Sequence, residues 1–498
     1  MKTTFLLLAV LVMGMATPAP AAPASPNIVY ILADDLGYGD VQCLNPQHGK
    51  IKTPHLDKLA SQGMTFTDAH SGSSVCTPTR YGLLTGRYAW RSRLQSGVLD
   101  GTDDPPLIAA DRLTVPAFLK QHGYTTAILG KWHLGFLSEL PGDAKPSGGK
   151  SKKSKGSGLP VGARIIDGPM TRGFDYFWGC SNARTISGLI ENDRVIENIE
   201  AVTMLPRLGQ RAVKYISTRA DEAKSGKPFF LFLPLTAPHT PILPTVEWQG
   251  KSGIGDYGDF VMQTDAVVGA VLAELDKQSL TDNTLVIFTS DNGCSKAAGF
   301  PNLEKHGHYA SADLRGSKAD IWDGGHRVPF FVRWPGKIAA ASESSQLICH
   351  TDFMATCAEM LGAKLPENAA EDSFSILPAL LGTATSPVHE TVIHHSINGS
   401  FAIRQGKWKL ELCADSGGWT APKPGSKEAR DLPDTQLYDL SIDKAETKNL
   451  QAEYPNEVTR LSKLLQEFID NGRTTPGAKQ ENDVPVKLRK KRRGTVEE

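Results

Sequence analysis

Residues 26–37, PNIVYILADDLG, place an uninterrupted apolar run directly before two adjacent carboxylates, Asp34 and Asp35. The run itself, residues 28–33, shows no alternation of apolar and polar side chains. Continuous apolar character is typical of a strand that helices cover on both faces, as in a mostly parallel α/β sheet. This stretch therefore predicts a buried strand whose carboxyl end presents two acidic groups.

Four more short runs of apolar or β-branched residues repeat this pattern, at residues 125–129, 229–233, 285–289 and 328–332. An apolar stripe at near-helical spacing runs from Asp259 onward and stops before Leu285, which predicts a helix followed by a strand. The expected fold class is therefore α/β, with a large, mostly parallel sheet between layers of helices.

Polar side chains follow four of these predicted strands. They are Asp34 and Asp35, then Lys131 and His133, then His239, and finally Asp291 and Asn292. Ligands of open α/β sheets bind beyond the carboxyl ends of the strands, so we expect these side chains to meet in one pocket. Taken singly, each is better explained as a strand-end turn or a helix cap, because Asp and Asn favour those places.

The pattern changes after about residue 384. Short strands are expected at residues 394–396, 401–404, 408–412 and 436–440, and a helical stripe runs through Val458, Leu461, Leu464, Leu465 and Phe468. We therefore expect a catalytic domain over residues 26–385 and a smaller α+β domain with an antiparallel sheet over residues 386–475. Residues 141–160 are a low-complexity insertion and residues 476–498 a polar basic tail, both expected to be flexible.

The N-terminus predicts export. Lys2, the apolar run 5–12 and the small residues up to Ala24 make residues 1–24 typical of a signal peptide, and place the protein in the periplasm or outside the cell. The apolar run is shorter than the about 20 residues that span a bilayer, and no later stretch is long enough, so no membrane span is expected.

Charge and cysteine content narrow the classes of partner. Fifty-four basic and fifty-four acidic residues give a formal net charge of zero, so no overall field draws the chain to nucleic acid. Seven cysteines leave one over if the others pair outside the cytosol. With Cys76 set aside, six could form up to three disulfides, and their spacing does not choose a pairing.

The segment from Cys76 to Gly86 has the pattern of a short helix. Pro78 at its start and Gly86 near its end bound it, and its N-terminus presents Cys76. Backbone N–H groups at that end favour anions, and Arg80, one turn on, would add positive charge beside the cysteine. The plainer interpretation is a buried cysteine with a surface arginine. A cysteine phosphatase loop would need arginine at position 82, where the chain has Gly82.

The string C-x-P-x-R, read as Cys76-Thr77-Pro78-Thr79-Arg80 and followed by Thr85-Gly86, resembles the signature of the type I sulfatases. The similarity extends through further segments in the same order. These are Asp34-Asp35, residues 130–135, Pro238-His239, Asp291-Asn292-Gly293, Arg315 to Lys318, Gly324-Gly325 and Leu437 to Leu440. The resemblance implies an alkaline-phosphatase-like α/β/α sandwich with a small C-terminal domain.

The resemblance also implies the chemistry of Cys76. In that family a separate maturation enzyme oxidises the motif cysteine to Cα-formylglycine, which hydrates to a gem-diol. One hydroxyl attacks the sulfur of a sulfate ester and the other helps to expel sulfate, so one hard displacement becomes two easier steps. Cys76 is thus expected to be the precursor of the nucleophile.

The oxygen ligands of Asp34, Asp35, Asp291 and Asn292 suit Ca2+, or alternatively Mg2+, better than zinc. By resemblance the ion is calcium, and modified Cys76 completes the ligand set. The remaining roles also follow from the resemblance. Arg80 and Lys131 hold the diol and the metal end, Lys131, His239 and Lys318 bind the sulfate, and His239 is the general acid, with Lys318 sharing that role. Asp291 accepts the attacking proton, and His133 abstracts the proton that triggers sulfate release.

These observations predict a hydrolase of sulfate monoesters of the arylsulfatase type, with sulfated carbohydrates as the expected substrates. Two alternatives stay open at this point. A phosphatase or phosphonate monoester hydrolase of the same superfamily would bind a similar tetrahedral anion. A non-catalytic carbohydrate-binding relative would keep the pocket without its chemistry.

Overall fold

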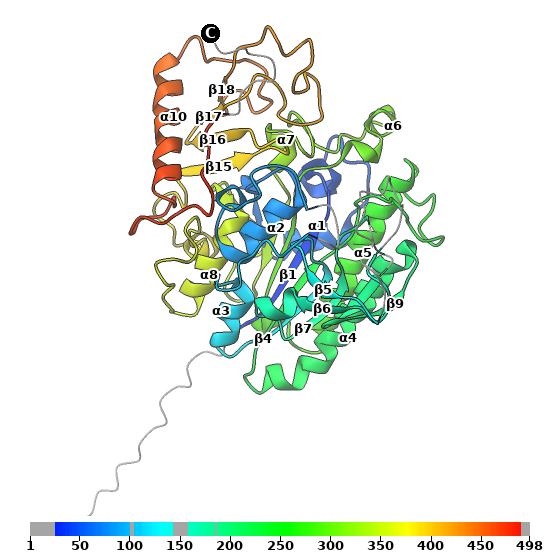
Figure 1. Cartoon of the computed structure of the whole chain (residues 1–498). Coiled ribbons are helices and arrows are strands. Elements are labelled where there is room, and N and C mark those ends of the chain that lie inside the picture. The colour runs from blue at the N-terminus through cyan, green and yellow to red at the C-terminus, as the bar shows by residue number, and fades with distance from the viewer. Residues whose placement is uncertain (1–24, 100–103, 143–157, 185, 187, 490–498) are drawn as a thin grey trace, which may run out of the picture.

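The computed structural model describes residues 25–99, 104–142, 158–184, 186 and 188–489 (Figure 1). The predicted signal peptide, residues 143–157 of the predicted insertion, and the last nine residues of the predicted tail lie outside the described residues. Within the described part of the chain, no helix is long and apolar enough to cross a membrane.

The strands of the structure fall into three sheets. Their bounds are β1 Asn27–Ala33, β2 Met64–Phe66, β3 Ala69–His70, β4 Thr125–Lys131, β5 Leu137–Glu139, β6 Arg164–Asp167, β7 Tyr176–Cys180, β8 Gly188–Glu191, β9 Arg194–Asn198, β10 Phe229–Pro234, β11 Thr284–Ser290, β12 Phe330–Arg333, β13 Ser342–Ser344, β14 Ile348–Cys349, β15 Thr391–His395, β16 Phe401–Gln405, β17 Trp408–Glu411 and β18 Gln436–Asp439.

The α-helices lie between these strands and at the C-terminal side of the chain. They are α1 Pro54–Ser61, α2 Cys76–Thr85, α3 Val115–Gln121, α4 Met204–Lys224, α5 Asp256–Lys277, α6 Phe300–Lys305, α7 Asp323–His326, α8 Phe353–Met360, α9 Leu377–Leu380 and α10 Pro455–Asp470.

The largest sheet has twelve strands in the order β13-β2-β12-β11-β1-β10-β4-β7-β8-β9-β6-β5. Its centre, β11-β1-β10-β4-β7, is parallel throughout, and β1 pairs with β10 on one side and β11 on the other. This centre contains four of the five predicted strands. The predicted fold class, a mostly parallel sheet covered by helices plus a small antiparallel sheet, is confirmed.

Alternate residues of β1 enter two separate cores, one on each face of the sheet. Ile28, Tyr30 and Leu32 pack with side chains of α2, α3 and α8. Val29, Ile31 and Ala33 pack with side chains of α1, α4 and α5. All seven residues of β1 are buried, because helices cover both faces, and that is why the run lacks polar alternation.

The fifth predicted strand differs from the other four. β12 begins at Phe330 and runs antiparallel to β11. Pro329 has no N–H to donate to a neighbouring strand, so the strand starts after it although the apolar run starts at Val328.

The small sheet, β15-β16-β17-β18, is antiparallel throughout. On one face α10 buries Leu461, Leu465 and Ile469 against it. On the other face it packs on Ile321 and Trp322, next to α7. Figure 1 shows α10 and this sheet together on one side of the large sheet. The boundaries predicted for the two domains stay a prediction.

Two expectations need correction. The described part of the C-terminal segment is not a free tail, because Asp483 forms an ion pair with buried Arg87 at 3.0 Å. Val486 and Leu488 also pack against the core beneath the small sheet. All seven cysteines are free thiols in the structure, so none of the disulfides that the sequence left open is formed.

Candidate active site

The strand-end side chains predicted to meet do come together at the carboxyl ends of the central parallel strands. Asp34 and Asp35 follow β1, Asp291 and Asn292 follow β11, and Lys131 ends β4. Backbone hydrogen bonds hold these strand ends together. The N–H of Asp34 donates to the carbonyl of Ala237, and the N–H of Asp291 donates to the carbonyl of Ala33, both at 3.0 Å. All five side chains are buried.

Helix α2 brings Cys76 to this site. The helix begins at Cys76, two residues before Pro78, and Gly86 closes it in the left-handed conformation with φ of 65°. Every residue of the helix is buried, Arg80 included, so the alternative of a surface arginine is wrong. The thiol is a close electrostatic neighbour of Arg80, Asp291 and Lys318.

Arg80 and Lys131 tie two carboxylates together. The Nη2 of Arg80 donates to Oδ2 of Asp291 at 2.7 Å and lies 3.5 Å from Oδ1 of Asp34. The Nζ of Lys131 donates to both oxygens of Asp34, at 2.8 and 2.9 Å. Burial alone would raise the pKa of Asp34, but the surrounding cations, Lys131 first, hold it well below its ordinary value.

Lys318 reaches the site from a loop that packs closely against the end of β11, because glycines at the contact leave no side chain between the two backbones. A Cβ on Gly293 would lie 1.9 Å from the carbonyl oxygen of Gly324, a distance that no side chain can occupy. The same contact lets the N–H of Gly293 donate to the carbonyl of Gly325 at 2.9 Å. The Nζ of Lys318 then donates to Oδ1 of Asp35 at 2.5 Å.

The acidic residues carry features of a cation site. Oδ2 of Asp35 and Oδ1 of Asn292 are buried and have no hydrogen-bond partner among the described residues. Burial and the adjacent charge of Asp34 raise the pKa of Asp291 well above its ordinary value. Unpartnered oxygens beside crowded carboxylates fit a hard divalent cation, because such an ion would supply the missing contacts and relieve the repulsion. His239 belongs to the same group of candidate ligands as Asp34 and Asp35.

His133 follows β4 in a left-handed conformation, with φ of 56°. Its Nε2 lies 2.8 Å from the carbonyl oxygen of Leu99, so Nε2 carries the proton. Nδ1 is buried with no hydrogen-bond partner in the described residues. Burial first, and then the charge of Lys131, lowers the pKa of His133 well below its ordinary value. The ring is therefore neutral, with one free lone pair.

His239 is likewise a neutral ring. Its Nδ1 donates to the carbonyl of Thr240 at 2.5 Å, and its Nε2 lies 3.7 Å from Oδ2 of Asp35. Burial lowers its pKa to about 4, although Asp35 acts in the opposite direction. Nε2 of His239 is therefore an acceptor. Asp35 keeps Lys318 protonated against the effect of burial by raising its pKa.

The sequence missed other buried polar residues near this region. In the sequence, His306 and His308 lie between Asn292 and Lys318, where exposed loop polarity is a better interpretation than contact with the substrate. Instead His308 is buried and its Nε2 lies 2.8 Å from Oδ1 of Asp40, which also accepts a hydrogen bond from Gly37 through its other oxygen. This pair braces the turn after Asp35. Nothing in the spacing of two residues 268 positions apart indicates the contact.

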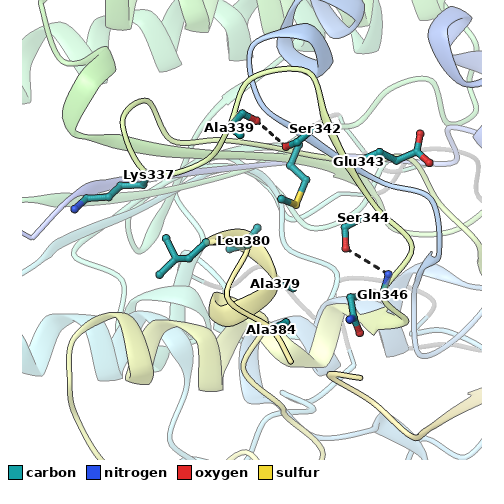
Figure 2. A pocket seen from close by; sticks show the side chains of 12 residues that line it. Lys337, Ala339, Ser342, Glu343, Ser344, Gln346, Ala379, Leu380 and Ala384 are labelled. Carbon is teal, nitrogen blue, oxygen red and sulfur yellow. Dashed lines mark hydrogen bonds between the residues drawn. The ribbon is translucent and has the colours of Figure 1, made fainter. Parts of the chain in front are cut away.

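A surface pocket of about 410 Å3 lies elsewhere, between β13 and α9. Figure 2 shows its lining, which includes Ser342 with its hydroxyl bonded to the carbonyl of Ala339. None of the predicted site residues lines it, so the pocket plays no part in the chemistry considered below.

Comparisons with known proteins agree with this fold and site. The family model described as Sulfatase matches residues 26–363. An N-acetylgalactosamine-6-O-sulfatase of Bacteroides thetaiotaomicron is 33% identical over 89% of this chain and 92% of its own length. Human arylsulfatase A is 33% identical over 89% of this chain and 86% of its own length.

A solved structure described under the metabolism of multiple glycosaminoglycans by Bacteroides thetaiotaomicron superposes with a TM-score of 0.77. It is 31% identical, over 89% of this chain and 99% of that one. The chain therefore belongs to the sulfatase family, as its motifs implied. It is an enzyme that hydrolyses sulfate esters, which favours the sulfatase over the phosphatase and non-catalytic alternatives.

Proposed function

We propose that this sulfatase removes sulfate from sulfated carbohydrates, using a formylglycine made from Cys76 and one divalent cation held by the acidic end of β1 and β11. The proposal depends most on one observation. Cys76 opens a buried helix beside Arg80, Asp291 and Lys318, and Asp35, which Lys318 contacts, has like Asn292 an acceptor oxygen without a partner within the described residues.

The donor set fits calcium, with Mg2+ as the alternative. Asp34, Asp35, Asp291 and Asn292 would hold the ion through oxygen atoms, together with the modified side chain at position 76. When bound, the ion supplies positive charge that stabilises a hydroxyl nucleophile and the sulfate oxygens. Formylglycine, when hydrated, supplies the hydroxyl that a thiol lacks.

Arg80 and Lys131 prepare the nucleophile end of the site. Arg80 is fixed by Asp291 and by the carbonyl of Lys131, to which its Nη1 donates at 3.1 Å. Its guanidinium therefore stays beside residue 76 without a conformational search. Asp291 can accept the proton of the attacking hydroxyl when it is ionised, and its raised pKa makes it a stronger base than an ordinary carboxylate.

Lys318 and His239 face the leaving-group side. Lys318 is charged, so it can bind a sulfate oxygen and give a proton to the departing alcohol. His239 can act as the general acid only after it takes up a proton, because Nε2 is unprotonated in the structure. We therefore assign the larger share of proton donation to Lys318, a change of emphasis from the sequence-based prediction.

His133 supplies a base. Its free Nδ1 can accept the proton whose loss releases sulfate, and the Leu99 carbonyl keeps the other nitrogen protonated and the ring oriented.

The substrate class is supported by what the similar proteins are named for. One acts on N-acetylgalactosamine 6-sulfate groups by its name, and another is described with glycosaminoglycan metabolism. We propose a sulfated sugar as the natural substrate, and a periplasmic or extracellular location, based on residues 1–24. A separate maturation enzyme is then required to oxidise Cys76.

The test combines mass and activity. Protein from its natural host, or co-produced with a maturation enzyme, is digested, and the peptide containing position 76 is weighed. We expect the mass of the aldehyde and release of sulfate from sulfated monosaccharides with a higher kcat/KM than from aryl sulfates. Cys76→Ala should release none while keeping its circular dichroism. An unmodified thiol in protein that turns over sulfate would contradict the proposal, and a preference for aryl sulfates would contradict the substrate class alone.

A further inference from the structure

Three buried histidines from distant parts of the chain meet where the two-stranded sheet β14-β3, helix α7 and the small sheet adjoin. His70 ends β3, His326 ends α7 and His394 lies in β15. Their exposed fractions are 0%, 1% and 0%. One nitrogen atom from each ring lies within 4.8 Å of the others. None of the three is among the residues that carry the proposed reaction.

Each ring has one nitrogen bonded to an oxygen acceptor, which determines where its proton resides. Nε2 of His70 lies 2.9 Å from Oδ1 of Asp68. Nε2 of His326 lies 3.0 Å from the carbonyl oxygen of Ile321, and Nδ1 of His394 lies 3.0 Å from the carbonyl oxygen of Ser71. A carboxylate or carbonyl behind each imidazole is the arrangement that orients histidine ligands of metal ions.

The opposite nitrogens are then bare acceptors. Nδ1 of His70 and Nδ1 of His326 face each other at 3.0 Å, although each ring already donates from Nε2. Nε2 of His394 is buried without a hydrogen-bond partner among the described residues. Lone pairs so close repel. Moving the proton of His326 to Nδ1 would instead set its Nε2 lone pair against the carbonyl oxygen of Ile321 at 3.0 Å, so a cation at the cluster, either a shared proton or a metal ion, relieves both repulsions.

Neighbouring charges do not supply that cation. The Nζ of Lys409 is 3.2 Å from Nε2 of His326, the nitrogen that also faces the carbonyl of Ile321. Its three protons already have closer acceptors, namely Oδ1 of Asp323 at 2.8 Å, Oε1 of Glu446 at 2.5 Å and the carbonyl of Ile321 at 3.1 Å. Arg404 is likewise paired with Asp68.

Burial lowers the pKa of all three imidazoles below the ordinary histidine value. Protonating the cluster is therefore costly, and the rings stay neutral. A neutral imidazole has a free lone pair on one nitrogen, and this is the form that binds a metal ion.

We propose that His70, His326 and His394 bind one divalent transition-metal ion of the zinc class, separate from the oxygen-ligated cation of the active site. Imidazole nitrogens select zinc, cobalt, nickel or copper over calcium and magnesium. The rings of His326 and His394 are stacked, with centroids 3.8 Å apart and planes at 12°. One of them must tilt for the three lone pairs to converge on the ion.

The ion would brace the segment that leads to Cys76. Ser71, which fixes His394, follows His70 directly, and the N–H of Ser74 donates to the carbonyl of His395 at 3.2 Å. The N–H of Ala319, next to Lys318, donates to the carbonyl of Ser74 at 2.9 Å. A metal at the three histidines therefore links the small sheet to both sides of the active site without touching substrate.

The first experiment uses the full chain without a polyhistidine tag, folded in zinc-supplemented medium and dialysed against a chelator to remove loosely bound ions. Elemental mass spectrometry is expected to find about one zinc-class ion per chain. X-ray absorption at the zinc edge should show scattering from imidazole ligands. A protein without transition metal, or with zinc bound only by oxygen or sulfur, would overturn the proposal.

Variants localise the ion. His394→Gln is expected to lose it, whereas His389→Gln should keep it, because His389 is equally buried but pairs with Asp352 at 2.7 Å outside the cluster. Asp35→Asn, which alters the active-site cation, should also keep it. Retention by His394→Gln would overturn the assignment. If that variant does not fold, the metal content and absorption spectrum of the unaltered chain decide.

Discussion

The Nζ of Lys318 lies 2.5 Å from Oδ1 of Asp35, although the two residues are 283 positions apart. The same oxygen accepts a hydrogen bond from Nδ2 of Asn292 at 2.8 Å. The other oxygen of Asp35 has no hydrogen-bond partner in the described part of the chain. Asp35 therefore connects Lys318, which is expected to bind the sulfate, with the expected metal site. Substituting Lys318 should change metal binding, and substituting Asp35 should change the position of Lys318.

Calcium is expected to stabilise the enzyme through Asp35. A ligand that binds only the folded state adds about 2.7 kcal/mol to its stability at 100 times its Kd. Thermal unfolding with and without calcium should therefore show a rise in Tm for the wild type and little or none for Asp35→Asn. The exposed Asp313→Asn should keep the wild-type rise. An unchanged calcium response in Asp35→Asn would remove this residue from the ligand set.

Lys318→Ala is expected to lose more activity on sugar sulfates than on 4-nitrophenyl sulfate. A positioned proton donor contributes roughly 10²–10⁴-fold, and a nitrophenolate leaves without needing one. The measurement is kcat for both substrates in the variant and the wild type, with exposed Lys305→Ala as the control. Equal losses on both substrates would assign Lys318 to sulfate binding alone and return the general acid role to His239.

Gly293→Ala is expected to displace the loop that carries Lys318. The added Cβ would meet the carbonyl oxygen of Gly324 at 1.9 Å, so the backbone must move, at a cost of about 1–3 kcal/mol for an overpacked site. We expect a lower Tm and a large loss of kcat. Gly293 is not among the glycines with a positive φ, so the expected cost comes from this contact and not from left-handed backbone strain. A Gly293→Ala enzyme with wild-type kcat would show that the loop tolerates the shift.

Stability should fall in mild acid partly because of His350. Burial lowers the pKa of this histidine to about 3, and its Nε2 bonds to the hydroxyl of Thr289 at 3.0 Å. Between an unfolded pKa of about 6.5 and this folded value, only the unfolded chain takes up the proton, so stability is complete above pH 6.5 and is lost as pH falls. The expected loss from pH 7 to pH 5 is about 2 kcal/mol from this group.

Denaturant unfolding of wild type and His350→Gln at both pH values measures this contribution. The variant should lose about 2 kcal/mol less than the wild type over that range. His306→Gln, exposed on the surface, should follow the wild type. A His350→Gln variant with the wild-type pH dependence would mean that the proton is taken up elsewhere.

Much of this fold could be predicted from local patterns. The apolar run before Asp34 and Asp35 requires burial on both faces, and alternate side chains of β1 do enter two cores. The prediction for the fifth run was only partly right. The strand starts after Pro329, and its antiparallel direction depends on which strand lies next to it, which a local pattern does not show. The prediction of a flexible C-terminal tail was wrong for its described part, because polar composition does not show that Asp483 pairs with the buried Arg87.

By itself the sequence determined the four central strands β1, β4, β10 and β11, the helix that begins at Cys76 and the identity of the residues at the strand ends, since these follow from burial periodicity and from motifs within a few residues. Only the tertiary structure decided which charges are paired, which oxygens lack partners, that His239 is neutral, and that His70, His326 and His394 meet. Those properties depend on contacts between side chains up to several hundred positions apart, and on the loss of water around them, neither of which any local pattern encodes.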